Sequence, residues 1–148
     1  MYSIYAGSGI DEKAVSEALD SILSYLGESG DFSLHFVSDD EIRALNRDYR
    51  GKDEPTDILT FALSDGEAFP SFEGEERELG DVFISLESMR RNASAFSVPE
   101  DEELHRLLIH GLLHLLGFDH ATNDFASEPM LIRQEEMMRS LGFSSAGT

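Results

Sequence analysis

Apolar residues recur at intervals of three and four positions in several stretches of the chain, which is the spacing of one face of a helix. The first such stretch starts at Asp11 and stops at Gly27. The second starts at Ser38, where Glu41 three positions later completes a helix-start signature, and it stops at Gly51. Helices are predicted likewise at 87–96, from Pro99 into a histidine-rich stretch, and at 127–141.

Shorter runs of alternating or continuous apolar residues predict strands. They read YSIYA, SLHFV, DILTFAL and DVFISL, at 2–6, 33–37, 57–63 and 81–86. The acidic segment 64–78 contains Gly and Pro and is predicted to form a loop. This order of elements predicts an α/β (α+β) fold in which about five helices pack on a mixed four-stranded sheet. We expect a single domain over 1–148, with a frayed C-terminus at 144–148.

Composition narrows the class of protein. The chain has 148 residues, of which 41% are hydrophobic, which suits one globular domain and argues against wholesale disorder. No apolar run approaches the roughly 18 residues that a membrane span needs, and the N-terminus has no signal-peptide pattern. Cysteine is absent, so any metal must be bound by nitrogen and oxygen atoms. These features favour a cytoplasmic protein without a membrane partner.

The charge is strongly acidic, because 11 Lys and Arg residues stand against 30 Asp and Glu residues, a net charge of −19. Such a surface disfavours unselective binding to nucleic acid. The basic residues are unevenly spread, however, and four of them lie within ten positions: Arg43, Arg47, Arg50 and Lys52. This cluster is either a local basic patch on an acidic body or the solvated face of a helix, and its spacing alone does not separate the two.

Three of the five histidines occur in one stretch, HGLLHLLGFDH at 110–120. His110 and His114 are four positions apart, so on a helix they lie on one face and can bind the same ion. Gly117 can end the helix in the left-handed conformation and let the chain bring His120 back toward the other two. Three imidazoles with an open fourth position describe a catalytic zinc site. We therefore predict one Zn²⁺ per chain, with Ni²⁺ or another divalent ion as the alternative.

The remaining histidines lack such neighbours in the sequence. His35 is predicted to be an ordinary strand residue, and His105 a surface or packing residue of a helix.

Gly111 directly follows the first histidine of this stretch. The spacing of the three histidines is that of the metzincin proteases, in which the corresponding residue is the glutamate that acts as general base. Glycine has no side chain that could accept a proton. The interpretation as a peptidase therefore lacks its base, and the glycine is expected to allow the close approach of another backbone or of a substrate.

The histidine stretch resembles the signature of the YbeY family, which comprises bacterial metal-dependent endoribonucleases needed for ribosomal RNA maturation. Two further segments are similar to blocks of that family: LNRDYRGKDEPTDILTF at 45–61 and LGDVFIS at 79–85. The order and spacing agree over about 30–142. Thr60 stands where the family usually has serine, and Ala62 where proline is common.

The resemblance implies that His110, His114 and His120 hold zinc in a cleft, and that Arg50 is the family's important arginine. It implies a single-strand-specific endoribonuclease that matures the 3′ end of small-subunit ribosomal RNA and serves in ribosome quality control. The implied partners are RNA and the small subunit or its assembly proteins, and we expect a monomer. An arginine suits this role because a guanidinium can bind two phosphate oxygens at once.

Several alternatives stay open from the residues themselves. Arg50 could pair with a carboxylate at the end of its helix, and Asp119 could either orient a metal ligand or cap the turn. The chain could also be a zinc hydrolase of another substrate, such as a metzincin-like peptidase. A third possibility is a non-catalytic ribosome assembly factor in which zinc only holds the fold.

Overall fold

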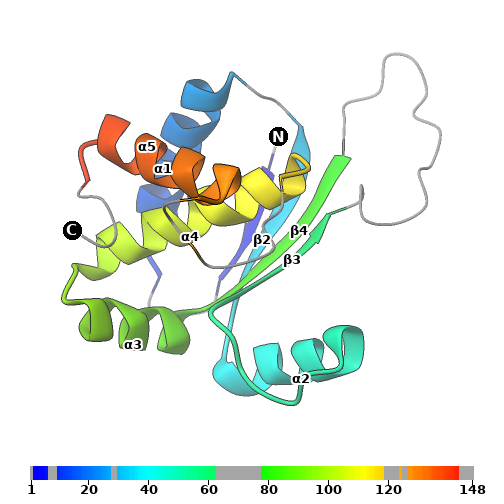
Figure 1. Ribbon diagram of the computed structural model, residues 1–148. Helices are drawn as coiled ribbons and strands as arrows, with labels where there is room; N and C mark the ends of the chain where they lie inside the picture. The colour runs from blue at the N-terminus through cyan, green and yellow to red at the C-terminus, as the bar shows by residue number, and fades with distance from the viewer. Residues whose placement is uncertain are drawn as a thin grey trace.

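A computed structural model describes residues 2–6, 10–27, 30–62, 78–118, 124 and 127–143 of the chain. Four strands form one mixed sheet, in the order β1 (Tyr2–Tyr5), β2 (Asp31–Val37), β4 (Glu78–Ser85), β3 (Ile58–Ala62) (Figure 1). The pairs β1–β2 and β2–β4 are parallel, and β3 runs antiparallel to β4 at the edge. The predicted mixed four-stranded sheet is confirmed.

Five helices complete the described structure: α1 (Glu12–Leu26), α2 (Asp39–Arg50), α3 (Leu86–Phe96), α4 (Glu100–Leu115) and α5 (Pro129–Ser140). The Ser38 side chain accepts a hydrogen bond from the Glu41 amide at 3.1 Å, as the helix-start signature predicts. Gly27 and Gly51 follow α1 and α2 with φ of 65° and 74°, a left-handed conformation that glycine adopts at low cost. The predicted fold class, α/β (α+β) with about five helices, is therefore confirmed.

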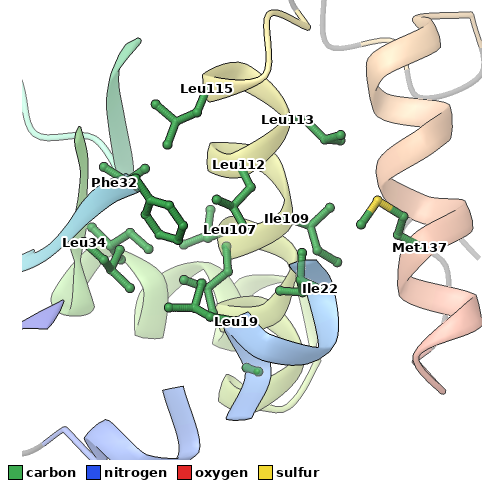
Figure 2. Close-up of a cluster of buried hydrophobic side chains, with 14 of the residues drawn as sticks. Leu19, Ile22, Phe32, Leu34, Leu107, Ile109, Leu112, Leu113, Leu115 and Met137 are labelled. Atoms are coloured by element: carbon green, nitrogen blue, oxygen red, sulfur yellow. The ribbon is translucent and has the colours of Figure 1, made fainter. Parts of the chain in front are cut away.

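The hydrophobic core lies between one face of the sheet and the helices α1, α3, α4 and α5, of which α4 contacts all the others (Figure 1). Ile109 and Leu113 of α4 are fully buried. Figure 2 shows α4 side chains between Phe32 and Leu34 of the sheet and Met137 of α5. None of the described helices is long and apolar enough to cross a membrane.

The ends of several elements differ from the sequence-based expectation. β2 begins at Asp31 rather than 33, and β4 begins at Glu78, inside the segment predicted as a loop. Both strands extend because Asp31 pairs with Glu78 and Phe32 with Gly80, contacts between distant segments that local alternation does not reveal. α5 begins at Pro129 rather than 127. The rest of the predicted loop and the C-terminal segment 144–148 lie outside the described residues.

A charged cluster lies within the helical layer. Arg106 of α4 is only 8% exposed, and carboxylates from α4 and α5 surround it: Glu102 at 3.8 Å, Glu103 at 3.4 Å and Glu135 at 3.1 Å. Burial raises the pKa of Glu103 to about 7, and the charges of Asp57 and Glu135 act in the same direction against the opposing effect of Arg106.

This cluster predicts a specific pH dependence of stability. The folded pKa of Glu103, about 7, lies above its ordinary value of 4.5, so folded protein keeps a proton that the unfolded chain releases. The free energy of unfolding should therefore fall as the pH rises from about 4.5 to about 7. The glutamine in Glu103→Gln does not titrate, so the variant does not lose this stability as the pH rises. We expect the melting temperature of Glu103→Gln to exceed that of the wild type by about 5 °C at pH 8. Thermal unfolding followed by circular dichroism checks this.

The exposed residue Glu17 of α1 provides the matched control, because Glu17→Gln makes the same change in charge where no burial acts. The melting temperature of Glu17→Gln should follow that of the wild type at every pH measured. Parallel curves for Glu103→Gln and the wild type would contradict the assignment.

Candidate metal centre

His110 and His114 lie side by side in the second half of α4. Their Nε2 atoms are 3.2 Å apart, and their ring centroids are 4.7 Å apart. The buried apolar faces of α4 fix this arrangement, because Leu112 and Leu113 between the two histidines anchor the helix in the core. The structure thus brings the two together as the four-residue spacing predicts.

Each imidazole is oriented through its other nitrogen. The Nδ1 atom of His110 lies 2.6 Å from Oε1 of Gln134 on α5, and that of His114 lies 3.1 Å from the carbonyl oxygen of Phe118. The amide of Gln134 is itself oriented, because its nitrogen donates to Glu135 at 2.9 Å. Both neighbours of the rings are therefore acceptors, so each Nδ1 carries the proton in a neutral ring, and each Nε2 presents a lone pair.

This donor set fits a divalent cation. Two lone pairs at 3.2 Å repel each other unless positive charge lies beside them. In a tetrahedral zinc site with bonds of about 2.0–2.1 Å, two ligand nitrogens are about 3.3 Å apart. The distance between the two Nε2 atoms is close to that value, and the acceptors on Nδ1 are the partners that metal-bound histidines usually have. By this spacing, His110 and His114 could hold one zinc ion between them.

The third predicted ligand, His120, lies outside the described residues, as does Asp119. Within the described part of the chain, no three His, Asp or Glu side chains are grouped closely enough to hold a metal. The complete ligand set, and the role of Asp119, therefore stay predictions.

The other two histidines have the structural surroundings that their isolation predicts. His35 of β2 stacks between Tyr5 and Phe83, with ring centroids 4.7 and 4.4 Å away. His105 packs on Phe143, and its Nδ1 atom lies 2.8 Å from the carbonyl oxygen of Asp101.

Gln134 is a site residue that sequence reasoning missed. It is separated from His110 by 24 positions, so no local spacing connects them. The available signal was a polar residue on the buried face of a predicted helix, since Gln134 is only 2% exposed among Met130, Leu131 and Met138. A buried amide needs a hydrogen-bond partner, and the partner is the imidazole.

Gly111 allows a close approach, as expected, and what approaches it is the sheet rather than a substrate. A Cβ atom there would lie 3.1 Å from Cδ1 of Ile58 and 3.1 Å from Cγ1 of Val82. The glycine faces the sheet, and it lets α4 approach β3 and β4 closely. A carboxylate at this position would enter the core.

Arg50 ends α2 beside the edge strand β3. Its Nη2 donates to the carbonyl oxygen of Thr60 at 2.6 Å, and its guanidinium carbon lies 5.1 Å from the centroid of the Phe61 ring. The Thr60 bond uses the backbone, so serine or threonine serves equally there. Within the described residues no carboxylate pairs with Arg50, and the alternative of an ion pair at the helix end is not observed there.

The other arginines of the basic cluster are neutralised by neighbours. Arg43 pairs with Asp53 at 2.8 Å, and Arg47 pairs with Asp48 at 3.0 Å. These pairs lower the pKa of Asp53 and raise that of both arginines, chiefly through hydrogen bonds between the paired side chains. The cluster therefore behaves mostly as a solvated helix face, and among its arginines only Arg50 has no carboxylate partner in the described part of the chain.

The histidine pair and Arg50 both come from elements that contact the edge strand β3. Gly111, next to His110, contacts Ile58, while Arg50 holds Thr60 two residues further along the same strand. An oriented histidine pair and an exposed arginine, placed on either side of an edge strand in an α/β domain, form a candidate site of a hydrolase that could take a divalent cation and an anionic substrate.

Comparison with known proteins agrees with the resemblance of the sequence motifs. The sequence profile of the family described as endoribonuclease YbeY matches residues 7–142. The endoribonuclease YbeY of Halalkalibacterium halodurans is 43% identical over 77% of this chain and 74% of that protein, and that of Persephonella marina is 39% identical over 89% and 84%. The solution structure of TM1509 from Thermotoga maritima aligns with a TM-score of 0.62 at 30% identity, covering 95% of this chain and 89% of that one.

This chain belongs to the YbeY family of endoribonucleases. That membership confirms the resemblance and supports a nuclease that hydrolyses RNA.

The packing of Gly111 generates a prediction for Gly111→Glu. The new side chain would overpack the interface with Ile58 and Val82 and bury a charge, so we expect a loss of several kcal/mol of stability. It should not give a peptidase. Thermal unfolding and a casein cleavage assay measure the two expectations.

Ala95→Glu, on the exposed side of α3, adds the same charge without entering the core. This control should melt close to the wild type. A stable Gly111→Glu protein that cleaves casein would refute both the packing argument and the rejection of a peptidase.

Proposed function

We propose that this chain is a single-strand-specific, zinc-dependent endoribonuclease. In this proposal it acts as a monomer in the cytoplasm, matures the 3′ end of small-subunit ribosomal RNA and takes part in ribosome quality control with the small subunit or its assembly proteins. Family membership supports the nuclease activity. The observation that carries the metal dependence is the pair of Nε2 atoms, which are 3.2 Å apart while an oxygen lies within hydrogen-bond distance of each Nδ1.

His110, His114 and His120 are the proposed ligands of one zinc ion per chain. When bound, zinc supplies positive charge for a phosphoryl oxygen and lowers the pKa of water. Gln134 keeps the Nε2 lone pair of His110 directed away from α5, and the Phe118 carbonyl does the same for His114.

Arg50 is the proposed phosphate-binding residue. A guanidinium has five N–H donors, and one of those of Arg50 is used by the Thr60 carbonyl. The remaining donors can bind two oxygens of one phosphate and stabilise the negative charge that develops as the phosphodiester bond breaks. The bond to Thr60 and the contact with Phe61 hold the side chain in place before RNA arrives.

The alternatives are weaker. A peptidase of metzincin type needs a general base after the first histidine, and Gly111 with its contact to Ile58 offers neither a base nor room for one. A non-catalytic assembly factor is less favoured because the chain belongs to a family of endoribonucleases. It is separated from the proposal by an RNA cleavage assay on the purified protein, with metal analysis of the same sample.

The decisive variants are Arg50→Ala and Arg50→Lys. We expect Arg50→Ala to lower kcat/KM for RNA cleavage by about 10²–10³-fold, the usual cost of a group that stabilises developing charge. Arg50→Lys should stay badly impaired, because lysine keeps the charge but cannot bind two oxygens with a planar fork. Zinc content and melting temperature should change little, since Arg50 is exposed.

Arg90→Ala on α3 is the control, because this exposed arginine pairs with Glu100 at 3.3 Å away from the site. It should cleave RNA at the wild-type rate. Near-normal cleavage by Arg50→Ala would remove Arg50 from the site, and wild-type protein that carries zinc but leaves RNA intact would favour the assembly factor.

The hydrogen bond from His110 to Gln134 gives a prediction for metal affinity. Gln134→Leu leaves the imidazole without its acceptor, so the proton can move to Nε2 and compete with the metal. We expect the zinc affinity to fall about 10- to 100-fold, measured by competition with a chromophoric chelator. Glu136→Gln, on the exposed side of α5, should bind zinc like the wild type. Unchanged affinity in Gln134→Leu would show that the bond does not orient the ligand.

A further inference from the structure

A ladder of aromatic rings crosses the face of the sheet opposite α4. The centroid distances between successive rings are 4.7 Å for Tyr5–His35, 4.4 Å for His35–Phe83, 5.7 Å for Phe83–Phe61 and 5.5 Å for Phe61–Tyr49. The ladder runs through all four strands in their spatial order and ends on α2. It fixes the Phe61 ring, above which the Arg50 guanidinium lies.

The two ends of the ladder differ in charge. At one end, Glu12 and Glu41 line the same depression as Tyr5 and His35. Phosphate groups are repelled there. Asp81 lies 3.7 Å from His35 and is the register partner of Phe61, so it belongs to the middle of the ladder. At the other end, Tyr49 is 68% exposed and lies beside Arg50, which has no carboxylate partner in the described part of the chain. The charge of Arg50 therefore favours a phosphate at the Tyr49 end over the Tyr5 end.

We propose that Tyr49 and the Phe61–Arg50 pair form a stacking site for an unpaired RNA base, an inference that rests on the proposed ribonuclease function. A base stacks on the exposed ring of Tyr49 while Arg50 binds the neighbouring phosphate. A base inside a duplex is already stacked and paired, so it cannot reach the ring without being pulled out of the helix. The site therefore selects single strands, and it does so on the side of β3 that the histidines do not occupy.

The site fits RNA better than it fits an apolar partner protein. Tyr49 is one exposed ring with a polar hydroxyl, flanked by charged residues of α2 rather than by further exposed apolar side chains. An apolar docking surface needs a contiguous patch. A single aromatic ring next to a guanidinium is the combination that binds one base and one phosphate.

The test measures binding of a fluorescent oligoadenylate with 2′-O-methyl riboses to the full chain by anisotropy, with a gel to confirm that the strand stays intact. We expect Tyr49→Ala to weaken binding about tenfold. Tyr49→Phe should keep most of the affinity, and Tyr49→Leu should behave like Tyr49→Ala, because leucine is apolar but has no aromatic face. The same strand without bases should bind equally to the wild type and to Tyr49→Ala.

Phe96→Ala is the matched control, since Phe96 of α3 is 67% exposed but lies outside the ladder. It should bind like the wild type. The inference is overturned if Tyr49→Ala binds the oligoadenylate like the wild type, if it loses the baseless strand equally, or if the wild type binds neither strand.

An RNA cleavage assay separates this inference from the proposed function. Cleavage by the wild type together with unaltered binding by Tyr49→Ala would overturn the stacking site alone. Weakened binding by Tyr49→Ala in a protein that does not cut RNA would support the stacking site and overturn the nuclease.

Discussion

The burial of α4 between the sheet and α5 is the constraint on which the rest of the structure depends. Its apolar residues, such as Ile109 and Leu113, supply much of the core. A helix buried on most sides cannot leave its polar side chains to water, and α5 supplies partners for two of them. Glu135 meets Arg106, and Gln134, its neighbour in the chain, meets His110. The packing that stabilises the fold thereby also sets the orientation of an imidazole.

The sequence predicted what depends on local spacing. The helix-start signature at Ser38, the shared face of His110 and His114, and the fold class all follow from neighbours a few positions apart. Contacts between distant segments could not be predicted. Gln134 contacts His110 from another helix. Whether Gly111 faces the sheet or the solvent depends on how α4 packs across β3 and β4, which the local sequence does not reveal. The early starts of β2 and β4 likewise depend on strand pairing.

The acidic composition explains how one arginine of a basic cluster can be the one that binds phosphate. With a net charge of −19, most described arginines that could bind phosphate have a carboxylate nearby, as Arg43, Arg47 and Arg91 do. An exposed pair of this kind contributes little stability, but it makes the arginine a poorer anion site. Among the residues that the structure describes, Arg50 is held by a carbonyl and a ring instead, neither of which cancels its charge. Acidic surroundings thus restrict where a polyanion can bind and leave Arg50 available to it.

The edge strand β3 gives these separate features a common support. The backbone amide of Ser85 in β4 donates to the backbone carbonyl of Asp57, so this carbonyl points toward β4. Carbonyl directions alternate along a strand, and the Thr60 carbonyl therefore points away from β4, toward the free edge where the Arg50 side chain donates to it. Such a bond also occupies an edge that could otherwise pair with another chain. On one face Ile58 packs against Gly111, and on the other Phe61 joins the aromatic ladder. A shift of β3 would therefore displace the arginine, the stacking ring and the support of the histidine helix together, although these parts come from different elements.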